Sequence, residues 1–303
     1  MDSIIHYQAC PCCGSTNIST VLSAKDYTVS NETFTILECA NCTLRFTQDV
    51  EDEQHIGKYY QSENYISHSD TKKGIINQLY HYVRGITLKN KFKIVCSNTK
   101  KTSGALLDIG AGTGAFANFM QHAKWTVTGL EPDDTARSVA YNKFKLELQP
   151  PSTLFNIPEN QFDAITMWHV LEHVHNLNGY FEAFSKILKK NGKLFIAVPN
   201  YTSHDAANYQ EHWAAYDVPR HLYHFSPKSI DLLAKKFGFS VTAIQPMWYD
   251  SFYISMISEQ YKNGKGNLLK ACIVGFISNL KTMIDSKKCS SIIYVMSLEE
   301  SKK

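Results

Sequence analysis

Five of the eight cysteines lie in the first 42 residues, and four of these form two C-x2-C pairs: Cys10, Cys13, Cys39 and Cys42. Each pair can direct two thiolates at one ion across a tight turn, and two pairs complete the tetrahedral set that zinc prefers. Gly14 follows the first pair, where a knuckle turn needs a residue that tolerates positive φ. Four sulfur ligands leave no open position, so the sequence predicts a structural zinc ion. The alternative is a group of small buried cysteines without a metal.

A glycine-rich turn, DIGAGTG at 108–114, follows a short apolar run and precedes a helical pattern. The absence of Lys-Ser/Thr after its last glycine excludes a phosphate-binding P-loop. The turn matches the dinucleotide pattern G-x-G-x-x-G/A, and Glu131 follows at about the expected distance of 20 residues. Asp108, however, would repel a pyrophosphate and attract an ammonium group. S-adenosylmethionine carries that ammonium group and no phosphate, and Glu131 is placed to bind its two ribose hydroxyls. The turn therefore predicts S-adenosylmethionine rather than NAD.

Three successive motifs resemble those of class I S-adenosylmethionine-dependent methyltransferases: DIGAGTG at 108–114, GLEPD at 129–133 and FDAITMWHVLEHV at 162–174. The third is similar to a segment of ubiquinone-type O-methyltransferases and of many sugar or small-molecule methyltransferases. The resemblance spans residues 104–245. It implies that the methionine end of the cofactor contacts Asp108, Gly110, Ala111, Gly112 and Gly114, and that the ribose contacts Glu131. By the same resemblance, Pro132 and Asp133 flank the adenine, while Trp168 and His169 close over the methyl donor.

The third motif also contains H-x-x-E-H at 169–173, which is a zinc signature of inverzincin peptidases. That signature belongs inside a helix, but here a five-residue apolar strand leads directly into it, which argues against a peptidase. Glu172 and His173 then have two open interpretations. They cap a helix start and pack at the end of the sheet, or they contact the substrate.

A general base is needed only if the methyl acceptor is a hydroxyl or an acidic C–H, because methyl transfer from a sulfonium is an in-line displacement. Titratable residues gather in HDAANYQEHW at 204–213 and in DVPRHLYHFS at 217–226. The order of a four-cysteine segment, a methyltransferase core and H-L-x-x-F-S resembles deoxysugar C-methyltransferases, although Arg220 stands where that family has a glutamate. The resemblance implies His221 as the base. Otherwise His221 packs near the start of the next helix, and His169 becomes the catalytic candidate.

The elements that must position these residues alternate along the chain after residue 104. Apolar patterns predict strands at 105–109, 125–131, 146–149, 164–168, 193–198, 240–245 and 291–297, and helices at 115–123, 134–142, 177–189 and 227–237. This alternation is typical of an α/β fold, with a Rossmann-like, doubly wound, mostly parallel seven-stranded sheet. We expect three parts: a small zinc-ribbon-like segment at 1–48, a helical lid or connector at 49–103, and a methyltransferase domain at 104–303. In the connector, apolar residues recur at helical spacing from Ile75 to Ile86, and the lysines and arginines resemble a solvated face.

A predicted helical insert at about 248–288 contains two apolar stretches, FYISMIS at 252–258 and LLKACIVGFISNL at 268–280. The favoured interpretation is an extra helical layer over the substrate pocket. The alternatives are an apolar site for a lipid or quinone-like acceptor, and a surface at 252–280 that touches a membrane or a partner. No signal-peptide pattern opens the sequence, and no apolar stretch approaches the roughly 18 residues that cross a bilayer. We therefore expect a cytoplasmic protein.

The formal net charge of +3 is too small to indicate a nucleic-acid partner by itself. We expect an enzyme that transfers a methyl group from S-adenosylmethionine to a small-molecule acceptor, at a hydroxyl or an activated carbon of a sugar, quinone-like or lipid-linked compound. One alternative is an RNA methyltransferase that grips nucleic acid with its zinc ribbon, but the first 45 residues contain only Lys25 and Arg45 as basic side chains. A second alternative is a non-catalytic module that binds S-adenosylmethionine.

Overall fold

The structure, a computed structural model, describes residues 3–60 and 75–299 of the chain. Its centre is a six-stranded sheet in the order β11-β12-β9-β8-β6-β7. The strands are β6 (Ala105–Ile109), β7 (Thr126–Leu130), β8 (Phe162–Trp168), β9 (Leu188–Pro199), β11 (Phe239–Pro246) and β12 (Ser291–Leu298). β12 is antiparallel to both of its neighbours, whereas β7, β6, β8 and β9 pair in parallel. The predicted mostly parallel α/β sheet is confirmed.

The seventh predicted strand, at 146–149, is reduced to a single parallel bridge between Leu130 and Gln149 among the described residues. Two features limit its length. Lys145 ends the preceding helix with a left-handed φ of 59°, and Pro150 follows Gln149 directly. Proline has no N–H to donate, so the ladder cannot continue beyond the bridge. The sheet therefore has six named strands where seven were predicted.

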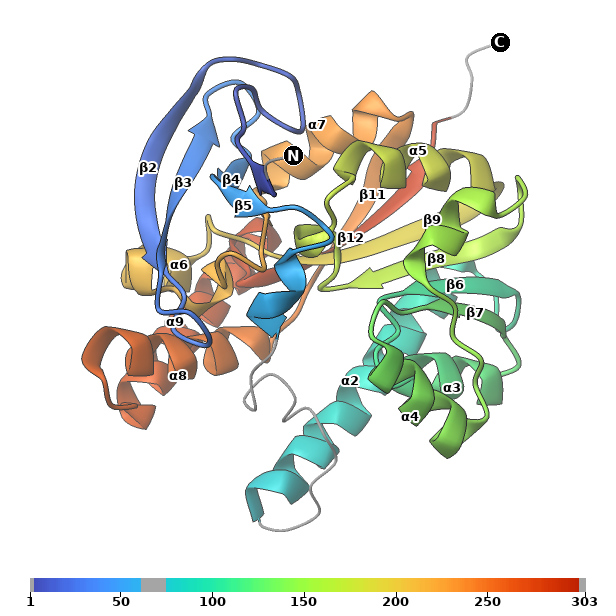
Figure 1. The fold of residues 1–303 in the computed structure, drawn as a ribbon. Coiled ribbons are helices and arrows are strands. Elements are labelled where there is room, and N and C mark those ends of the chain that lie inside the picture. Colours follow the sequence, from blue (N-terminus) through green and yellow to red (C-terminus); the bar gives the residue numbers. More distant parts are fainter. Residues whose placement is uncertain (1–2, 61–74, 300–303) are drawn as a thin grey trace.

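Helices cover both faces of the sheet (Figure 1). They are α2 (Ile75–Thr99), α3 (Ala115–His122), α4 (Asp134–Phe144), α5 (Leu177–Ile187) and α7 (Pro227–Lys236). Strand residues alternate between the faces: Leu106 joins a core with Val95 of α2 and Phe116 of α3, whereas Leu107 joins the core that contains α5 and α7. The helix ends of α3, α4, α5 and α7 lie within two residues of their predicted positions, and side-chain caps fix the starts of α4 and α7.

The N-terminal part forms a second sheet, ordered β10-β4-β3-β2 and antiparallel throughout. It contains β2 (Ile18–Lys25), β3 (Thr33–Cys39), β4 (Arg45–Thr47) and β10 (Tyr223–His224), while β1 (Ile4–Ile5) pairs with β5 (Val50–Glu51). β10 comes from the segment after β9, so this sheet joins the N-terminal ribbon to the predicted substrate loop. The division into segments 1–48, 49–103 and 104–303 stays a prediction, and the side chains at 61–84 lie outside the described residues.

Two segments extend the basic fold. After β9 come α6 (His204–Tyr209) and the 3-10 turns η4 (Gln210–His212) and η5 (Ala214–Tyr216). After β11 come α8 (Asp250–Asn263) and α9 (Leu268–Ile284), which pack against each other and against α6 (Figure 1). The remaining 3-10 turns are η1 (Ile56–Tyr60), η2 (Pro151–Asn156), η3 (Leu171–His173) and η6 (Ser286–Lys288). No helix in the described ranges is long and apolar enough to cross a membrane.

Candidate active site and metal centre

The glycine-rich turn connects β6 to α3 and brings the chain close to its neighbours. Gly110, Gly112 and Gly114 all adopt positive φ, at 69°, 56° and 77°. A Cβ at Gly110 would collide with Cγ2 of Val170, so this position requires glycine for space as well as for conformation. The N–H groups of Gly110 and Ala111 both donate to the carbonyl of Leu130, which holds the turn against the end of β7.

Two carboxylates frame this turn at the carboxyl edge of the sheet. Asp108 is buried in β6, and its Oδ1 accepts a 2.7 Å hydrogen bond from Thr166 Oγ1. Burial raises the pKa of Asp108 to about 6, although the bond from Thr166 and the charge of Lys91 act in the opposite direction. Glu131 follows β7 and accepts from the N–H groups of Gly112 at 2.7 Å and Asp133 at 3.1 Å. Burial raises the pKa of Glu131 as well.

The remaining predicted cofactor residues lie at the same edge. Asp133 caps α4 by accepting from the N–H of Ala136, and the carbonyl of Pro132 accepts from Arg137. Trp168 ends β8 and meets Phe116 of α3 edge to face, with 5.5 Å between ring centroids. The fold thus brings the ten predicted residues of the cofactor site into one region, although they come from three separate motifs.

Lys91 of α2 is a site residue that the sequence analysis missed. Its Nζ lies 4.6 Å from the ring centroid of Trp168, and its charge lowers the pKa of Asp108. One feature of the sequence, the helical spacing of Lys91 from two apolar residues, indicates this position. Lys91 lies three residues after Leu88 and four before Val95, which both belong to the core under the sheet, so it lies on the inner face of α2. The assignment of the lysines of α2 to a solvated face is therefore wrong for Lys91.

His169 lies beside the end of β8 with a left-handed φ of 58° and contacts two carboxylates. Its Nδ1 is 3.5 Å from Glu172 Oε1, and its Nε2 is 3.2 Å from Oδ2 of Asp250, the first residue of α8. Burial opposes protonation, but the two carboxylates outweigh it and raise the pKa of His169 to about 9. At neutral pH this histidine is protonated, which suits an electrostatic role better than proton uptake.

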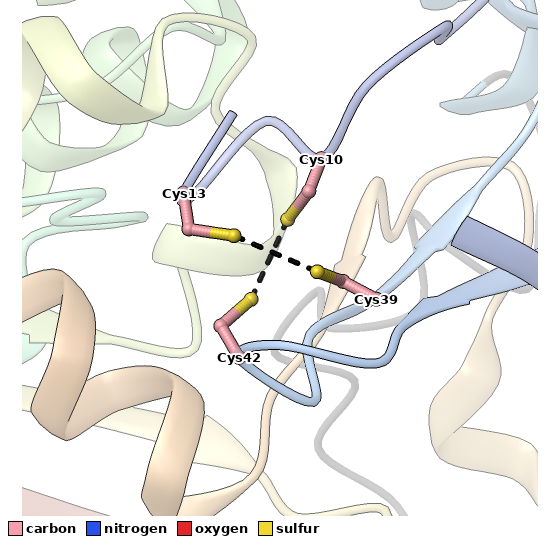
Figure 2. A group of neighbouring side chains, drawn as sticks. All are labelled: Cys10, Cys13, Cys39 and Cys42. Carbon is pink, nitrogen blue, oxygen red and sulfur yellow. Dashed lines mark hydrogen bonds between the residues drawn. The ribbon is translucent and has the colours of Figure 1, made fainter. Parts of the chain in front are cut away.

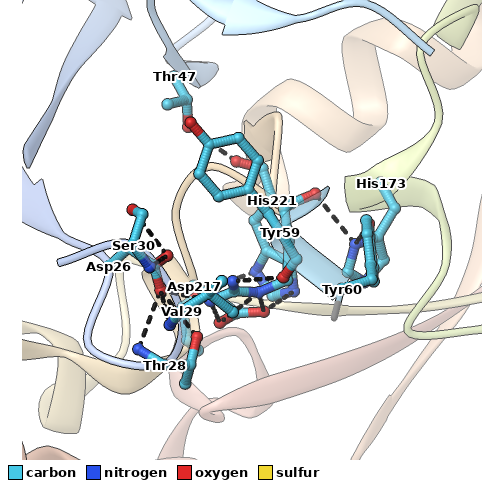
Figure 3. Close-up of polar contacts among 12 residues, drawn as sticks. Asp26, Thr28, Val29, Ser30, Thr47, Tyr59, Tyr60, His173, Asp217 and His221 are labelled. Atoms are coloured by element: carbon cyan, nitrogen blue, oxygen red, sulfur yellow. Dashed lines mark hydrogen bonds and ion pairs between the residues drawn. The ribbon is translucent and has the colours of Figure 1, made fainter. Parts of the chain in front are cut away.

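Glu172, His173 and His221 form a compact group in which the ligand-type atoms all lie within 4.8 Å of one another. His173 Nδ1 is 3.0 Å from the carbonyl oxygen of Arg220, and His221 Nδ1 is 2.8 Å from that of Ala215. Figure 3 labels both histidines. Because a carbonyl only accepts, each Nδ1 carries a proton, which leaves Nε2 as the ring nitrogen that can accept one. Burial lowers the pKa of His173 to about 4, so this ring is neutral.

Glu172 is fully buried in this group, and neither of its carboxylate oxygens has a hydrogen-bond partner among the described residues. Burial disfavours the charged form, but the contact with protonated His169 outweighs it and holds the pKa of Glu172 below its usual value. The group therefore combines a buried negative charge with two imidazole rings. A carboxylate in this position stabilises a proton that arrives on a neighbouring imidazole.

Arg220 stands where the deoxysugar C-methyltransferases have a glutamate before the histidine, and its contacts show what the arginine does here instead. Its side chain connects the N-terminal part to its own loop: Nη2 lies 3.0 Å from Asp26 Oδ1 and 2.6 Å from Asp217 Oδ1. Its Nη1 donates to the carbonyl of Tyr59 at 2.9 Å. The Arg220 side chain thus anchors the loop that carries His221, and only the backbone carbonyl of Arg220 reaches the candidate site, where it accepts from His173.

The other titratable stretch, 204–213, plays a structural part. Asp205 is buried and accepts hydrogen bonds from Trp213 Nε1, Ser278 Oγ and Ser290 Oγ, which joins α6 to α9 and to the start of β12. His204, the first residue of α6, lies beside Lys281 of α9. From the two predicted stretches, His221 is therefore the residue whose side chain joins Glu172 and His173.

The four paired cysteines converge (Figure 2). Their Sγ atoms all lie within 4.8 Å of one another, with 3.5 Å between Cys10 and Cys42 and 3.5 Å between Cys13 and Cys39. A tetrahedral ion with Zn–S bonds of about 2.3 Å places its sulfurs about 3.8 Å apart, which agrees with this spacing. Cys12 is buried nearby but does not belong to the group.

The two cysteine pairs have the same local geometry. Gly14 and Thr43, each directly after a pair, adopt positive φ of 75° and 59°. The N–H of Gly14 donates to the carbonyl of Cys10, and the N–H of Thr43 to that of Cys39, both at 2.8 Å. Two matching knuckles with four thiol ligands fit a structural zinc ion.

Comparison with known proteins identifies the family. A model of the methyltransferase domain family matches residues 81–244, which is more than half of the chain. The chain therefore belongs to this methyltransferase family. It is 32% identical to a ubiquinone biosynthesis O-methyltransferase of Pelagibacter ubique over 126 residues, which are 40% of this chain and 52% of that protein. It is 28% identical to a demethylmenaquinone methyltransferase of Tropheryma whipplei over 133 residues, or 42% and 56% of the two chains.

The chain thus spans about half the length of the curated relatives it matches. Among solved structures, a Burkholderia thailandensis 1,6-didemethyltoxoflavin-N1-methyltransferase aligns with 91% of this chain and all of its own, at 12% identity and a TM-score of 0.49.

Proposed function

We propose that this protein transfers a methyl group from S-adenosylmethionine to a small-molecule acceptor. The observation that carries the proposal is the pair of buried carboxylates, Asp108 and Glu131, on either side of a glycine-rich turn in a methyltransferase domain. Two negative charges at this place repel a pyrophosphate and suit a cofactor that presents an ammonium group and a ribose diol.

Each residue around the turn would bind a different part of the cofactor, which supplies a methyl group on a sulfonium. Asp108 binds the ammonium group, and Lys91 supplies a positive charge for the neighbouring carboxylate. Glu131 accepts from the ribose hydroxyls, and Pro132 and Asp133 flank the adenine. Trp168, packed on Phe116 and beneath Lys91, closes the methionine end. This arrangement excludes water from the reacting side and aligns donor and acceptor, where much of the rate of a displacement originates.

We propose that His221 takes the proton from the acceptor. Its Nδ1 is held by the carbonyl of Ala215, which leaves Nε2, 3.9 Å from Asp217 Oδ2, as the ring nitrogen that can accept a proton beside Glu172 and His173. Glu172 then stabilises the imidazolium that forms, because its buried charge lies within 4.8 Å and lacks a hydrogen-bond partner in the described part of the chain. Protonated His169 supports negative charge that develops on the acceptor.

Two arguments support a class of methyl acceptor: the general base in the candidate site and the names of the relatives. A base is useful for an ionisable hydroxyl or an activated carbon, and two relatives carry names from ubiquinone biosynthesis and from demethylmenaquinone methylation. We propose a small molecule of that kind, quinone-like or sugar-like, as the acceptor. The four-cysteine site would hold a zinc ion that stabilises the N-terminal ribbon and takes no part in the transfer.

The deciding experiment is calorimetric titration of the full chain with S-adenosylmethionine and, separately, with NAD. We expect binding of the first and none of the second; binding of NAD alone would refute the proposal. Incubation with methyl-labelled S-adenosylmethionine and two acceptor panels, hydroxyquinones and nucleotide-linked keto-sugars, then tests the transfer. A protein that binds the cofactor but labels neither panel would instead favour a non-catalytic binding module.

A further inference from the structure

The apolar and polar faces of α9 are the reverse of those of an ordinary surface helix. Its buried residues are small or polar: Ala271, Val274, Gly275, Ser278 and Thr282. Its exposed residues are large and apolar: Leu268, Leu269, Ile273, Phe276, Ile277, Leu280, Met283 and Ile284, with exposed fractions from 37% to 89%. On a helix with 3.6 residues per turn, these side chains cover about half of the circumference opposite the buried stripe.

Specific contacts fix the rotation of α9, so the outward position of its apolar side is built into the packing. Ser278 Oγ donates to buried Asp205 at 2.8 Å, and Asn279 Nδ2 donates to the carbonyl of Trp248 at 2.9 Å. A Cβ at Gly275 would lie 2.7 Å from the ring of Phe252 of α8, so only glycine allows the two helices to approach this closely. A rotation that buried Phe276 would break all three contacts.

Most of the charged side chains around this apolar side are lysines. Lys262 lies in the last turn of α8 and Lys265 in the loop before α9, while η6 after α9 carries Lys287 and Lys288, and all four lysines are exposed. Lys270 and Lys281 border the apolar side along the helix and contact Glu259 and His204. Within residues 260–290, all of which the structure describes, Asp285 is the only acidic residue. An apolar face flanked at both ends by lysines complements a surface that is apolar inside and anionic at its rim.

We propose that α9 and the turns at its two ends dock on the surface of an anionic lipid bilayer, with the helix lying in the plane of the interface. A helix of this length covers about 26 Å at 1.5 Å per residue, and it does not cross the membrane. Exposed Trp248, Tyr249 and Tyr253, at and before the start of α8, add aromatic groups of the kind that sit at headgroup level.

The charges argue against a second copy of this chain as the occupant. If two α9 helices packed face to face and antiparallel, Lys262 and Lys265 of each copy would lie opposite Lys287 and Lys288 of the other. In a parallel pair, the lysines at each end of α9 would face the same lysines of the other copy. Either arrangement sets like charges against each other with a single aspartate on each side to offset them, whereas anionic headgroups neutralise every lysine.

Docking would also place the active site beside the bilayer. Asp250 begins α8 and lies 3.2 Å from His169, so the helix that packs against α9 also borders the candidate site. If the proposed function holds, acceptors with an apolar chain would reach the site from the lipid. The docking itself does not depend on methyl transfer, and vesicle binding tests it separately.

The experiment is cosedimentation of the full chain with phosphatidylcholine vesicles and with vesicles that also contain phosphatidylserine. We expect binding to the second and weak or no binding to the first. Phe276→Ser should weaken binding about ten-fold or more, since one exposed aromatic side chain no longer enters the interface. Lys287→Glu combined with Lys288→Glu should weaken it at least about twenty-fold, at roughly five-fold per lost lysine, and high salt should do the same to the wild type.

Two matched controls lie far from α9. Phe155→Ser removes a phenylalanine of similar exposure that packs on Tyr180 of α5, and Lys190→Glu reverses an exposed lysine of β9. Both should bind vesicles like the wild type. Wild type that stays in the supernatant with both vesicles overturns the proposal. So does a dimer in sedimentation velocity that Phe276→Ser dissociates, because the face would then be an interface between copies.

Discussion

Arg220 and Asp26 form a buried ion pair, with Nη2 and Oδ1 3.0 Å apart and side chains that are 1% and 0% exposed. The pair joins positions 194 residues apart in the sequence. Asp26 also accepts from the N–H groups of Thr28 and Ser30, which orders the loop between β2 and β3. Through this pair the N-terminal hairpin holds the loop on which His221 lies.

Replacement of Arg220 by methionine should cost the protein about 3–5 kcal/mol of unfolding free energy, because it leaves the buried carboxylate of Asp26 without its partner. Urea unfolding of the full chain measures this. The matched control is Lys235→Met, which breaks an exposed pair with Asp231 and should cost about 1 kcal/mol or less. Equal effects of the two changes would contradict a stabilising role for the buried pair.

The same pair predicts a pH dependence. Burial disfavours the charged form of Asp26, but hydrogen bonds from Ser30, Thr28 and Arg220 outweigh it and hold the pKa of Asp26 below its usual range. A lowered pKa stabilises the fold above the unfolded value of about 4, and this contribution is lost as the pH falls further. Wild-type protein should therefore lose stability in acid more steeply than Asp26→Asn, as measured by unfolding at a series of pH values.

Zinc should be present at one ion per chain, held by Cys10, Cys13, Cys39 and Cys42. Elemental analysis of protein purified without chelator checks this, and a result of no zinc would refute it. Cys39→Ser should lose the ion, whereas Cys12→Ser, a change at a buried cysteine outside the group, should keep it. A chelator should remove hydrogen-exchange protection from β2, β3 and β4, and also from β10, which pairs with β4.

Asp108→Ala and Glu131→Ala should each weaken binding of S-adenosylmethionine by about 1–3 kcal/mol, since each leaves polar groups of the ligand unpaired. Calorimetry measures the loss, and Asp134→Ala, an exposed carboxylate at the start of α4, should bind normally. Because the pKa of Asp108 is about 6, its carboxylate loses its charge as the pH falls from neutral through that value. Wild-type affinity should fall over this range, and Asp108→Ala should lack that dependence. A pH-independent wild type would contradict a contact between Asp108 and the ammonium group.

His221→Asn should lower turnover by about a hundred-fold to ten-thousand-fold, with cofactor affinity nearly unchanged, because the cofactor residues lie on other elements. Turnover is measured with whichever acceptor the labelling panels identify.

His224→Asn is the matched control. His224 is buried three residues further on, in β10, and its Nε2 lies 3.1 Å from Thr47 Oγ1 of the N-terminal sheet. This change should lower stability and leave turnover of the folded protein near the wild-type value. If His221→Asn keeps wild-type turnover, His221 is structural, and His169 is the next candidate for a catalytic role.

Short-range patterns in the sequence were enough to predict the local parts of this protein. The C-x2-C spacing predicts the two cysteine knuckles. The glycines at 110, 112 and 114, all with positive φ, form the turn after β6. The alternation of apolar strands and amphipathic helices gave the α/β class and placed most elements within two residues. These features depend on neighbours along the chain, so spacing alone specifies them.

Only the tertiary structure decided which distant side chains meet. It placed Lys91 against Trp168, paired Arg220 with Asp26, and gathered Glu172 and His173 with His221. It also turned the apolar side of α9 outward, although the sequence of α9 reads like that of a buried helix. Each of these outcomes depends on how helices rotate and how loops cross a shared core. Many residues fix that packing together, and no local spacing encodes it.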